Sequence, residues 1–274
     1  YAGVQWDMGE LPAGPVSWYA GAEYNDWVYA DKYDAQSEAG NIIGSSGNSS
    51  GGVRDVTAAY VESLVPITEQ VELNLAGRFD DYSDFGSAFS PKASLRYQPL
   101  DNLMLRTSWS RSFRAPSLSD LYAADSYSAD WAKDYVYCEA NGISAADCPN
   151  RQYDTTRTSN EELKEETADT WNFGVAYSPL DDLNLSLDYY TIKIKDVIQL
   201  NSLQSVIYDE LNNGGSSNIT RNSQGKISGA IAPMVNLGTL NTSGLDLKLD
   251  YRYDLNSATI RYDLGGTYIL EYKE

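Results

Sequence analysis

Long segments of this chain alternate between apolar and polar residues with a period of two, and this pattern restricts the fold more than any other feature. Between residues 69 and 82, apolar or small residues occupy the odd positions and mostly polar residues the even ones. Successive side chains of a β-strand point to opposite faces, so the pattern predicts strands with one apolar face. The clearest segments are 69–82, 87–98, 101–110, 170–178, 182–190, 245–254 and 260–270. Residues 1–7, 16–30 and 53–65 fit less cleanly and raise the prediction to about ten strands.

The connections between these strands are short on one side and long on the other. Short turns are predicted at 66–69, 99–102, 179–182 and 256–257. Longer links are predicted at 31–52, 114–169 and about 197–243, with 81–86 as the one brief link on that side. Outer-membrane barrels have short periplasmic turns, long outer loops and aromatic girdles near the strand ends. Tyr97, Trp109, Tyr177, Tyr189 and Tyr251 fit such girdles.

The fold class predicted from these patterns is all-β, as part of a transmembrane antiparallel β-barrel with long extracellular loops and short periplasmic turns. The alternative is a soluble β-sandwich with one wet face on each sheet. A sandwich explains the alternation, but it does not explain long strands whose long loops lie on one side only. Seven leucines should face lipid in the barrel, because they alternate with polar neighbours. They are Leu73, Leu75, Leu183, Leu185, Leu187, Leu247 and Leu249.

Charge and composition exclude several functions. The formal net charge is -19, which disfavours a nucleic-acid partner because phosphates require lysine and arginine. The chain has no histidine, so histidine-dependent triads and most zinc chemistry are excluded. Paired carboxylates such as Glu165 and Glu166 lie in an acidic loop, where solvated charge is the simpler interpretation. We therefore expect no enzyme, no catalytic residue, no metal site and no cofactor.

Two cysteines, Cys138 and Cys148, lie ten positions apart in a polar stretch. In an oxidising compartment they would close a small loop, so we predict a disulfide on the outer side. The alternative is two free thiols.

One stretch is specific enough to indicate a family. Residues 111–122 read RSFRAPSLSDLY, where a strand enters a long loop. This closely resembles the phenylalanine-arginine-alanine-proline signature of TonB-dependent receptor barrels. Three further segments resemble family segments in the same order: FDDYSDFG with SPK at 79–92, NEELKEET with WNFG at 160–174, and NTSGLDL at 241–247. Glu161 and Glu165 stand where the family usually has proline, so the match at 160–167 is partial.

The resemblance implies a barrel of about 22 strands closed by a plug and powered by the inner-membrane partner TonB. Residues 1–274 would then be a barrel fragment, with the plug domain, the TonB box and the final strands outside it. We interpret both ends as cuts in a longer protein. The implied function is active uptake of a scarce nutrient of the siderophore, cobalamin, saccharide or peptide class across the bacterial outer membrane. The implied partners are TonB, outer-membrane lipid, lipopolysaccharide and a small-molecule ligand.

Three other functional classes stay open at this point. They are a passive porin-like channel, a barrel enzyme, which the absence of histidine disfavours, and a soluble β-rich binding protein.

Two groups of residues are candidates for roles at the outer rim. Arg114 is predicted to face inward and to pair with Glu165 or Glu166; the alternative is an exposed rim arginine. The loop from Ala115 to Asp169 is predicted to help capture the ligand, with Tyr122, Tyr127, Trp131 and Tyr135 as binding residues. The alternative is that these rings pack among themselves and order the loop.

Overall fold

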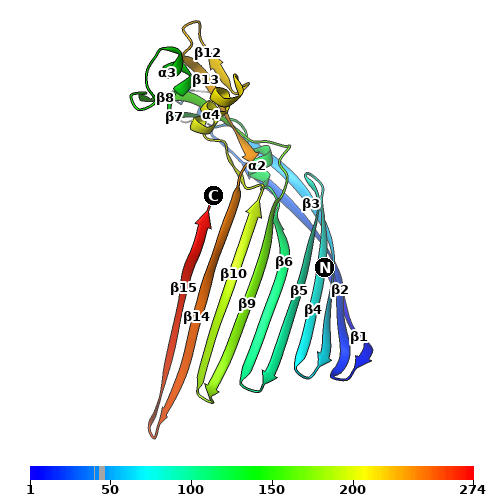
Figure 1. Ribbon diagram of the computed structural model, residues 1–274. Helices are drawn as coiled ribbons and strands as arrows, with labels where there is room; N and C mark the ends of the chain where they lie inside the picture. The colour runs from blue at the N-terminus through cyan, green and yellow to red at the C-terminus, as the bar shows by residue number, and fades with distance from the viewer. Residues whose placement is uncertain (40, 43–46) are drawn as a thin grey trace.

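The computed structural model describes residues 1–39, 41–42 and 47–274, and a ten-stranded antiparallel sheet dominates it (Figure 1). The sheet order is β1-β2-β3-β4-β5-β6-β9-β10-β14-β15. The strands are β1 (Ala2–Leu11), β2 (Gly14–Asp31), β3 (Ser50–Thr68), β4 (Val71–Tyr82), β5 (Gly86–Leu100), β6 (Leu103–Arg114), β9 (Glu166–Leu180), β10 (Leu183–Lys195), β14 (Thr239–Leu255) and β15 (Ala258–Lys273). The prediction of about ten antiparallel strands is confirmed.

The turns and long connections segregate to opposite ends of the sheet, as predicted. Five two-residue turns, 12–13, 69–70, 101–102, 181–182 and 256–257, lie at the lower end in Figure 1. The connections at the other end are 32–49, 83–85, 115–165 and 196–238.

The strand register gathers the apolar residues on one face, here called the apolar face. Leu185 lies opposite Tyr177 and Leu249, and Leu187 lies opposite Val175 and Leu247. Directly opposed residues of antiparallel strands point to the same side of the sheet. The other side, here called the polar face, would be the lumen wall of a closed barrel.

The register also explains the ambiguous alternation of residues 53–65. On β3, Val61 lies opposite Ala20 and Gly77, so the odd positions belong to the apolar face. Val56 and Ala58 belong to the polar face, yet they are buried, and the short helix α2 (Leu118–Tyr122) packs against β3. Apolar residues therefore occur on both sides of this strand, which obscures the period.

A glycine on the polar face allows an ion pair to cross an intervening strand. Arg106 on β6 and Asp188 on β10 both lie opposite Gly174 on β9. Arg106 Nε is 2.8 Å from Asp188 Oδ1, and Nη2 is 2.5 Å from Oδ2. A Cβ on Gly174 would lie 2.0 Å from Asp188 Oδ1, so only glycine leaves room for this bridge.

The two longest connections, which the sequence pattern predicts only as long loops, contain strands and helices of their own. They contain β7 (Ser126–Lys133), β8 (Asn150–Thr158), β11 (Ile198–Leu200), β12 (Ile219–Arg221) and β13 (Ile227–Asn236). The order β11-β13-β8-β7 forms a second sheet, with β12 beside β13. Helices α3 (Tyr135–Ala140) and α4 (Leu203–Asn213) accompany it, and α1 (Ala35–Glu38) lies in the connection 32–49. We call residues 115–165 and 196–238 together the cap; it lies at the long-loop end in Figure 1.

In the part of the chain that the structure describes, every helix is too short or too polar to span a membrane.

Candidate functional site

The cap joins two loops that are distant in sequence. Strand β8 of the first loop pairs in parallel with β13 of the second, from Thr155 opposite Ala230 to Thr158 opposite Pro233. Helix α4 covers one face of this sheet, where Val206 and Ile207 are almost fully buried against Ala132 and Ala230. Neither loop could bury these residues alone, so the two loops fold as one unit.

A buried ion cluster centred on Arg221 also joins the two loops. The Arg221 guanidinium donates to Asp134 of the first loop, at 2.8 and 2.9 Å, and to Glu210 of α4, at 2.8 and 2.7 Å. The side chains of Arg221, Asp134 and Glu210 are 17%, 5% and 11% exposed. Hydrogen bonds to both carboxylates raise the pKa of Arg221, so its guanidinium stays charged at any physiological pH. Buried charges of this kind are tolerated only when they are paired, so losing one partner would loosen the cap.

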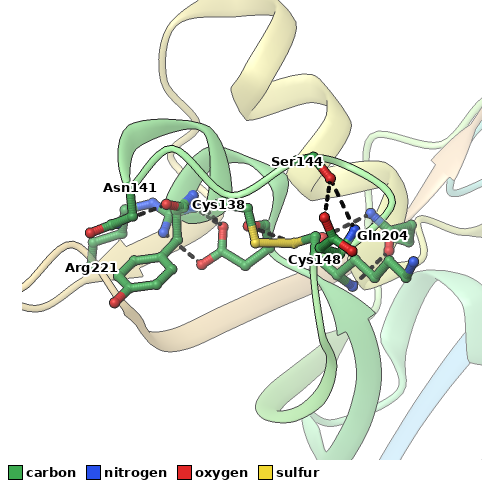
Figure 2. Close-up of a disulfide and its surroundings, with 10 residues drawn as sticks. Cys138, Asn141, Ser144, Cys148, Gln204 and Arg221 are labelled. Carbon is green, nitrogen blue, oxygen red and sulfur yellow. Dashed lines mark hydrogen bonds and ion pairs between the residues drawn. A yellow bond between two sulfur atoms is a disulfide. The ribbon is translucent and has the colours of Figure 1, made fainter.

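The disulfide lies beside this cluster. Cys138 and Cys148 are joined with an S–S distance of 2.09 Å, and both are buried. Cys148 Sγ is 3.5 Å from the backbone carbonyl oxygen of Asp134, which belongs to the cluster. Figure 2 shows the bridge with Arg221 of the cluster to one side of it. The bond constrains the segment 139–147, which includes the end of α3, and it lies close to the contact between Gln204 and the backbone of Lys133 (Figure 2).

The four predicted aromatic residues fall into two groups. Tyr135 stacks on Tyr208 of α4 with ring centroids 5.4 Å apart, and Tyr122 packs against Gly52 of β3, so both rings support the fold. In contrast, Tyr127 and Trp131 on the edge strand β7 are 51% and 62% exposed.

The two exposed rings lie on the cap face opposite α4. Tyr127 lies opposite Thr156, which in turn lies opposite Ile231, and Trp131 lies opposite Gln152. Ile231 is 41% exposed, so this face presents apolar surface to solvent. Rigid rings with polar neighbours suit contact with a ligand that has both apolar and polar groups.

A pocket of about 520 Å³ lies on the α4 side of the cap. Its volume suits a small molecule. Tyr135 and Tyr208 line it together with the disulfide-bridged segment; the other lining residues are Cys138, Glu139, Gly142, Ile143, Ser144, Ala145 and Leu211. Tyr135 is therefore both a packing residue and a pocket residue.

At the base of the cap, Arg114 contacts Glu166 and not Glu165. The two partners lie opposite each other on β6 and β9, on the polar face. Glu166 is buried and also accepts a hydrogen bond from the backbone N–H of Ile198 at 2.6 Å. Glu166 therefore connects two barrel strands to the start of the second loop.

Further contacts hold the cap to the barrel. Arg54 of β3 donates to the carbonyl oxygen of Pro116 at 2.8 Å, and its Nε lies 2.7 Å from Asp84. Asn160 donates to the carbonyl oxygen of Met234 at 3.0 Å, which ties the two loops together near the rim. Sequence reasoning did not single out Arg54 or Arg221, because both lie in stretches where neighbouring residues give no indication of a distant partner.

Within the described residues, no cluster of three or more acidic, histidine or cysteine side chains is arranged to hold a metal ion.

The family described as "TonB dependent receptor-like, beta-barrel" matches residues 2–273. The chain belongs to this family. Among curated relatives of this receptor barrel is a protein described as a probable TonB-dependent siderophore receptor, PirA, of Acinetobacter baumannii. It is 26% identical over 143 residues, which cover 52% of this chain and 17% of the relative. A hemin receptor of Yersinia pestis is 28% identical over 132 residues, which cover 46% of this chain and 17% of that receptor.

Solved structures share the fold of this receptor barrel. The siderophore receptor PirA from Acinetobacter baumannii superposes with a TM-score of 0.67 at 17% identity, covering 98% of this chain and 36% of that one. The ferric enterobactin receptor PfeA of Pseudomonas aeruginosa superposes with a TM-score of 0.71 at 18% identity, covering 98% and 35%. At this identity the likeness shows the fold alone. These relatives are described as receptors, so the alternative of a passive channel has no support among them.

Proposed function

We propose that the whole protein is an outer-membrane receptor that imports a small nutrient with energy supplied by TonB. The family match across residues 2–273 carries this proposal. In it, this chain supplies ten strands of the wall and the cap, while the plug and the segment that contacts TonB belong to other parts of the protein. The apolar face would contact lipid of the bacterial outer membrane, including lipopolysaccharide, and the polar face would contact the plug and trapped water.

The proposed ligand is an iron chelate of the siderophore class. One observation favours it over the cobalamin, saccharide and peptide classes, and a second favours it over hemin. The relatives described above are siderophore and hemin receptors. The absence of histidine removes a common axial ligand of haem iron from this part of the protein, which favours a siderophore over hemin.

The cap would capture the ligand before the plug moves. Tyr127 and Trp131 offer exposed rings on a strand whose opposite face is fixed by α4, so little conformational freedom is lost on binding. Binding at this face is spontaneous, and inward release would require the plug to shift. That shift is the step that needs work from TonB.

Uptake by cells that carry the full-length receptor tests the proposal. We would measure uptake of ⁵⁵Fe loaded on a catecholate and on a hydroxamate siderophore, with ⁵⁵Fe-hemin alongside, in strains with and without TonB. The expected result is saturable uptake of one siderophore class that disappears without TonB. TonB-independent, non-saturable entry of small sugars through the protein would instead establish a passive channel and overturn the proposal.

A further inference from the structure

One row of opposed residues on the apolar face carries charge, whereas the rows below it on the same strands carry mainly apolar side chains. Reading across β6, β9, β10, β14 and β15, the row is Arg111, Asp169, Lys193, Asn241 and Lys273. Lys195, two residues further along β10, belongs to the same face and lies opposite Thr167 and Thr239.

The rows next to this charged row indicate its position relative to the membrane. The adjacent row toward the short turns includes Trp109 and Trp171, and the next includes Phe173 and Tyr189. Trp109, Trp171 and Phe173 lie in contact, with ring centroids 6.2 and 6.1 Å apart. Below these rings lie the leucine rows of Leu187 and Leu185. Tryptophan and tyrosine rings mark the level of the lipid headgroups, so the charged row lies at or just above the outer headgroups.

In the described part of the chain, three of the four cations in this patch make no salt bridge. Arg111 pairs with Asp169, with Nε to Oδ1 at 2.9 Å and Nη2 to Oδ2 at 3.1 Å. Across the residues with described positions, Lys193, Lys195 and Lys273 have no carboxylate within 4.0 Å, and all three are exposed. Glu271, in the row below Lys273, is the other carboxylate of the patch. Four cations against two carboxylates give a local excess of positive charge on a chain whose net charge is -19.

Other parts of the same face at the long-loop end carry the opposite charge. Asp26 and Asp55 lie opposite each other on β2 and β3, and Asp81 lies nearby on β4. The positive patch is therefore a local feature of the β6–β15 sector rather than a general property of the rim.

We infer that Arg111, Lys193, Lys195 and Lys273 bind the phosphate groups of a phosphorylated glycolipid in the outer leaflet. The inference rests on the proposed function, because it requires the apolar face to lie in the outer membrane. Ammonium groups are donors for phosphate oxygens, and the Arg111 guanidinium, held by Asp169, adds a fixed donor beside them. The rings and leucines directly below would contact the acyl chains of the same lipid. A lipid with phosphate groups at the headgroup level and acyl chains below them would contact both the positive patch and the apolar rows.

The test measures lipid binding to the full-length receptor, purified in detergent and stripped of lipid. The probes are hexa-acylated lipid A with two phosphates and the same lipid after phosphatase treatment, with bound lipid counted by native mass spectrometry. The test variant is K193Q/K195Q. The matched control is Lys92→Gln, because Lys92 is also exposed on a barrel strand but lies on the polar face, opposite Ala76 and Ser110.

We expect the double variant to lose about 30-fold in affinity for phosphorylated lipid A, or about fivefold for each lysine near a charged membrane surface. K92Q should bind as the unaltered receptor does, and dephosphorylated lipid A should bind weakly to every variant. Equal affinity of K193Q/K195Q and the unaltered receptor would overturn the inference, as would no preference for the phosphorylated lipid. Failure of the proposed function would look different: the receptor would not fractionate with the outer membrane, and TonB-dependent uptake would be absent in the unaltered protein.

Discussion

Arg114 and Glu166 face each other across the β6–β9 pair at the outer rim and share two hydrogen bonds, with Nε to Oε2 at 2.8 Å and Nη2 to Oε1 at 2.5 Å. The two partners differ in their surroundings. The Arg114 side chain is 52% exposed, whereas the Glu166 side chain is 10% exposed and also accepts the N–H of Ile198. Glu166 is therefore the residue on which both the barrel rim and the second loop of the cap depend.

Replacing Glu166 should destabilise the rim more than replacing Arg114. Glu166→Ala leaves the buried N–H of Ile198 without an acceptor, which costs about 1–3 kcal/mol. Arg114→Ala opens the half-exposed side of the pair to water, so Glu166 exchanges that partner for solvent and the cost should be smaller, about 0–1 kcal/mol. The measurement is urea unfolding of the full-length receptor in lipid vesicles, together with the rate of protease cleavage within residues 196–238.

A double-mutant cycle separates pairing from local effects. Arg114 and Glu166 should couple, whereas Arg114 and Glu165 should not, since the contacts join Arg114 to Glu166 alone. Coupling to Glu165 of the same size as that to Glu166 would contradict the observed geometry.

The choice between these two glutamates could have been made from the sequence. Glu166 has the same parity as Asn172 and Gly174, which the alternation assigns to the polar face together with Arg114 across the sheet. Lys193 and Lys195 occupy odd positions, as Leu185 and Leu187 do, so the alternation also predicts that they lie on the apolar face. Their position was missed because polar residues in alternating strands are ordinarily assigned to the lumen.

Gly174 should tolerate a side chain poorly. A Cβ there would lie 2.0 Å from Asp188 Oδ1 and 2.6 Å from Arg106 Nε, so Gly174→Ala must push the two ion-pair partners apart. We expect a loss of about 1–3 kcal/mol in the free energy of unfolding, typical of overpacking. Gly265→Ala on β15 is the control, because no atom lies within 4 Å of its Cβ position. Similar losses at both glycines would show that the effect arises from the strand backbone and not from the Arg106–Asp188 ion pair.

Arginine substitutions on the two faces should differ in cost. Leu185 lies between Tyr177 and Leu249 on the apolar face, and Ser186 lies on the polar face opposite Ala176. Leu185→Arg near the membrane midplane should cost about 2–4 kcal/mol, and Ser186→Arg should cost less. Unfolding of both variants in vesicles measures the difference. Equal costs of the two substitutions would contradict the assignment of the apolar face to lipid.

The disulfide predicts a simple labelling result. A maleimide reagent should label neither Cys138 nor Cys148 in the folded receptor before reduction and both after reduction and unfolding, because the two are bonded and buried. Cys138→Ser/Cys148→Ser should destabilise the cap by about 2–3 kcal/mol, the range for a loop of this length. Faster proteolysis between residues 139 and 147, with the barrel still resistant, would follow from that loss. Labelling of both sulfurs without reduction would exclude the bond.

The architecture of the cap could not be predicted from the sequence. Its central parallel pairing joins Thr155 to Ala230, residues of two different loops, and parallel pairs depend on contacts that local periodicity does not record. Two of its strands are short, with three residues each in β11 and β12. Alternation over three residues is indistinguishable from chance.

The exposed rings of the cap allow the last prediction to separate binding from folding. Tyr127→Ala/Trp131→Ala removes two exposed rings from an edge strand and should weaken siderophore binding at least tenfold, at a cost to stability of less than about 0.5 kcal/mol, typical of surface changes. Tyr208→Ala is the comparison, because Tyr208 stacks on Tyr135 and supports α4. That variant should increase proteolysis of the cap.

Two measurements separate binding from folding. The first is binding of the ⁵⁵Fe-loaded siderophore identified by uptake, measured on purified receptor, and the second is heat-resistant mobility of the barrel. If binding survives in Tyr127→Ala/Trp131→Ala and falls in Tyr208→Ala, the ligand contacts the pocket beside α4 rather than the exposed face of β7.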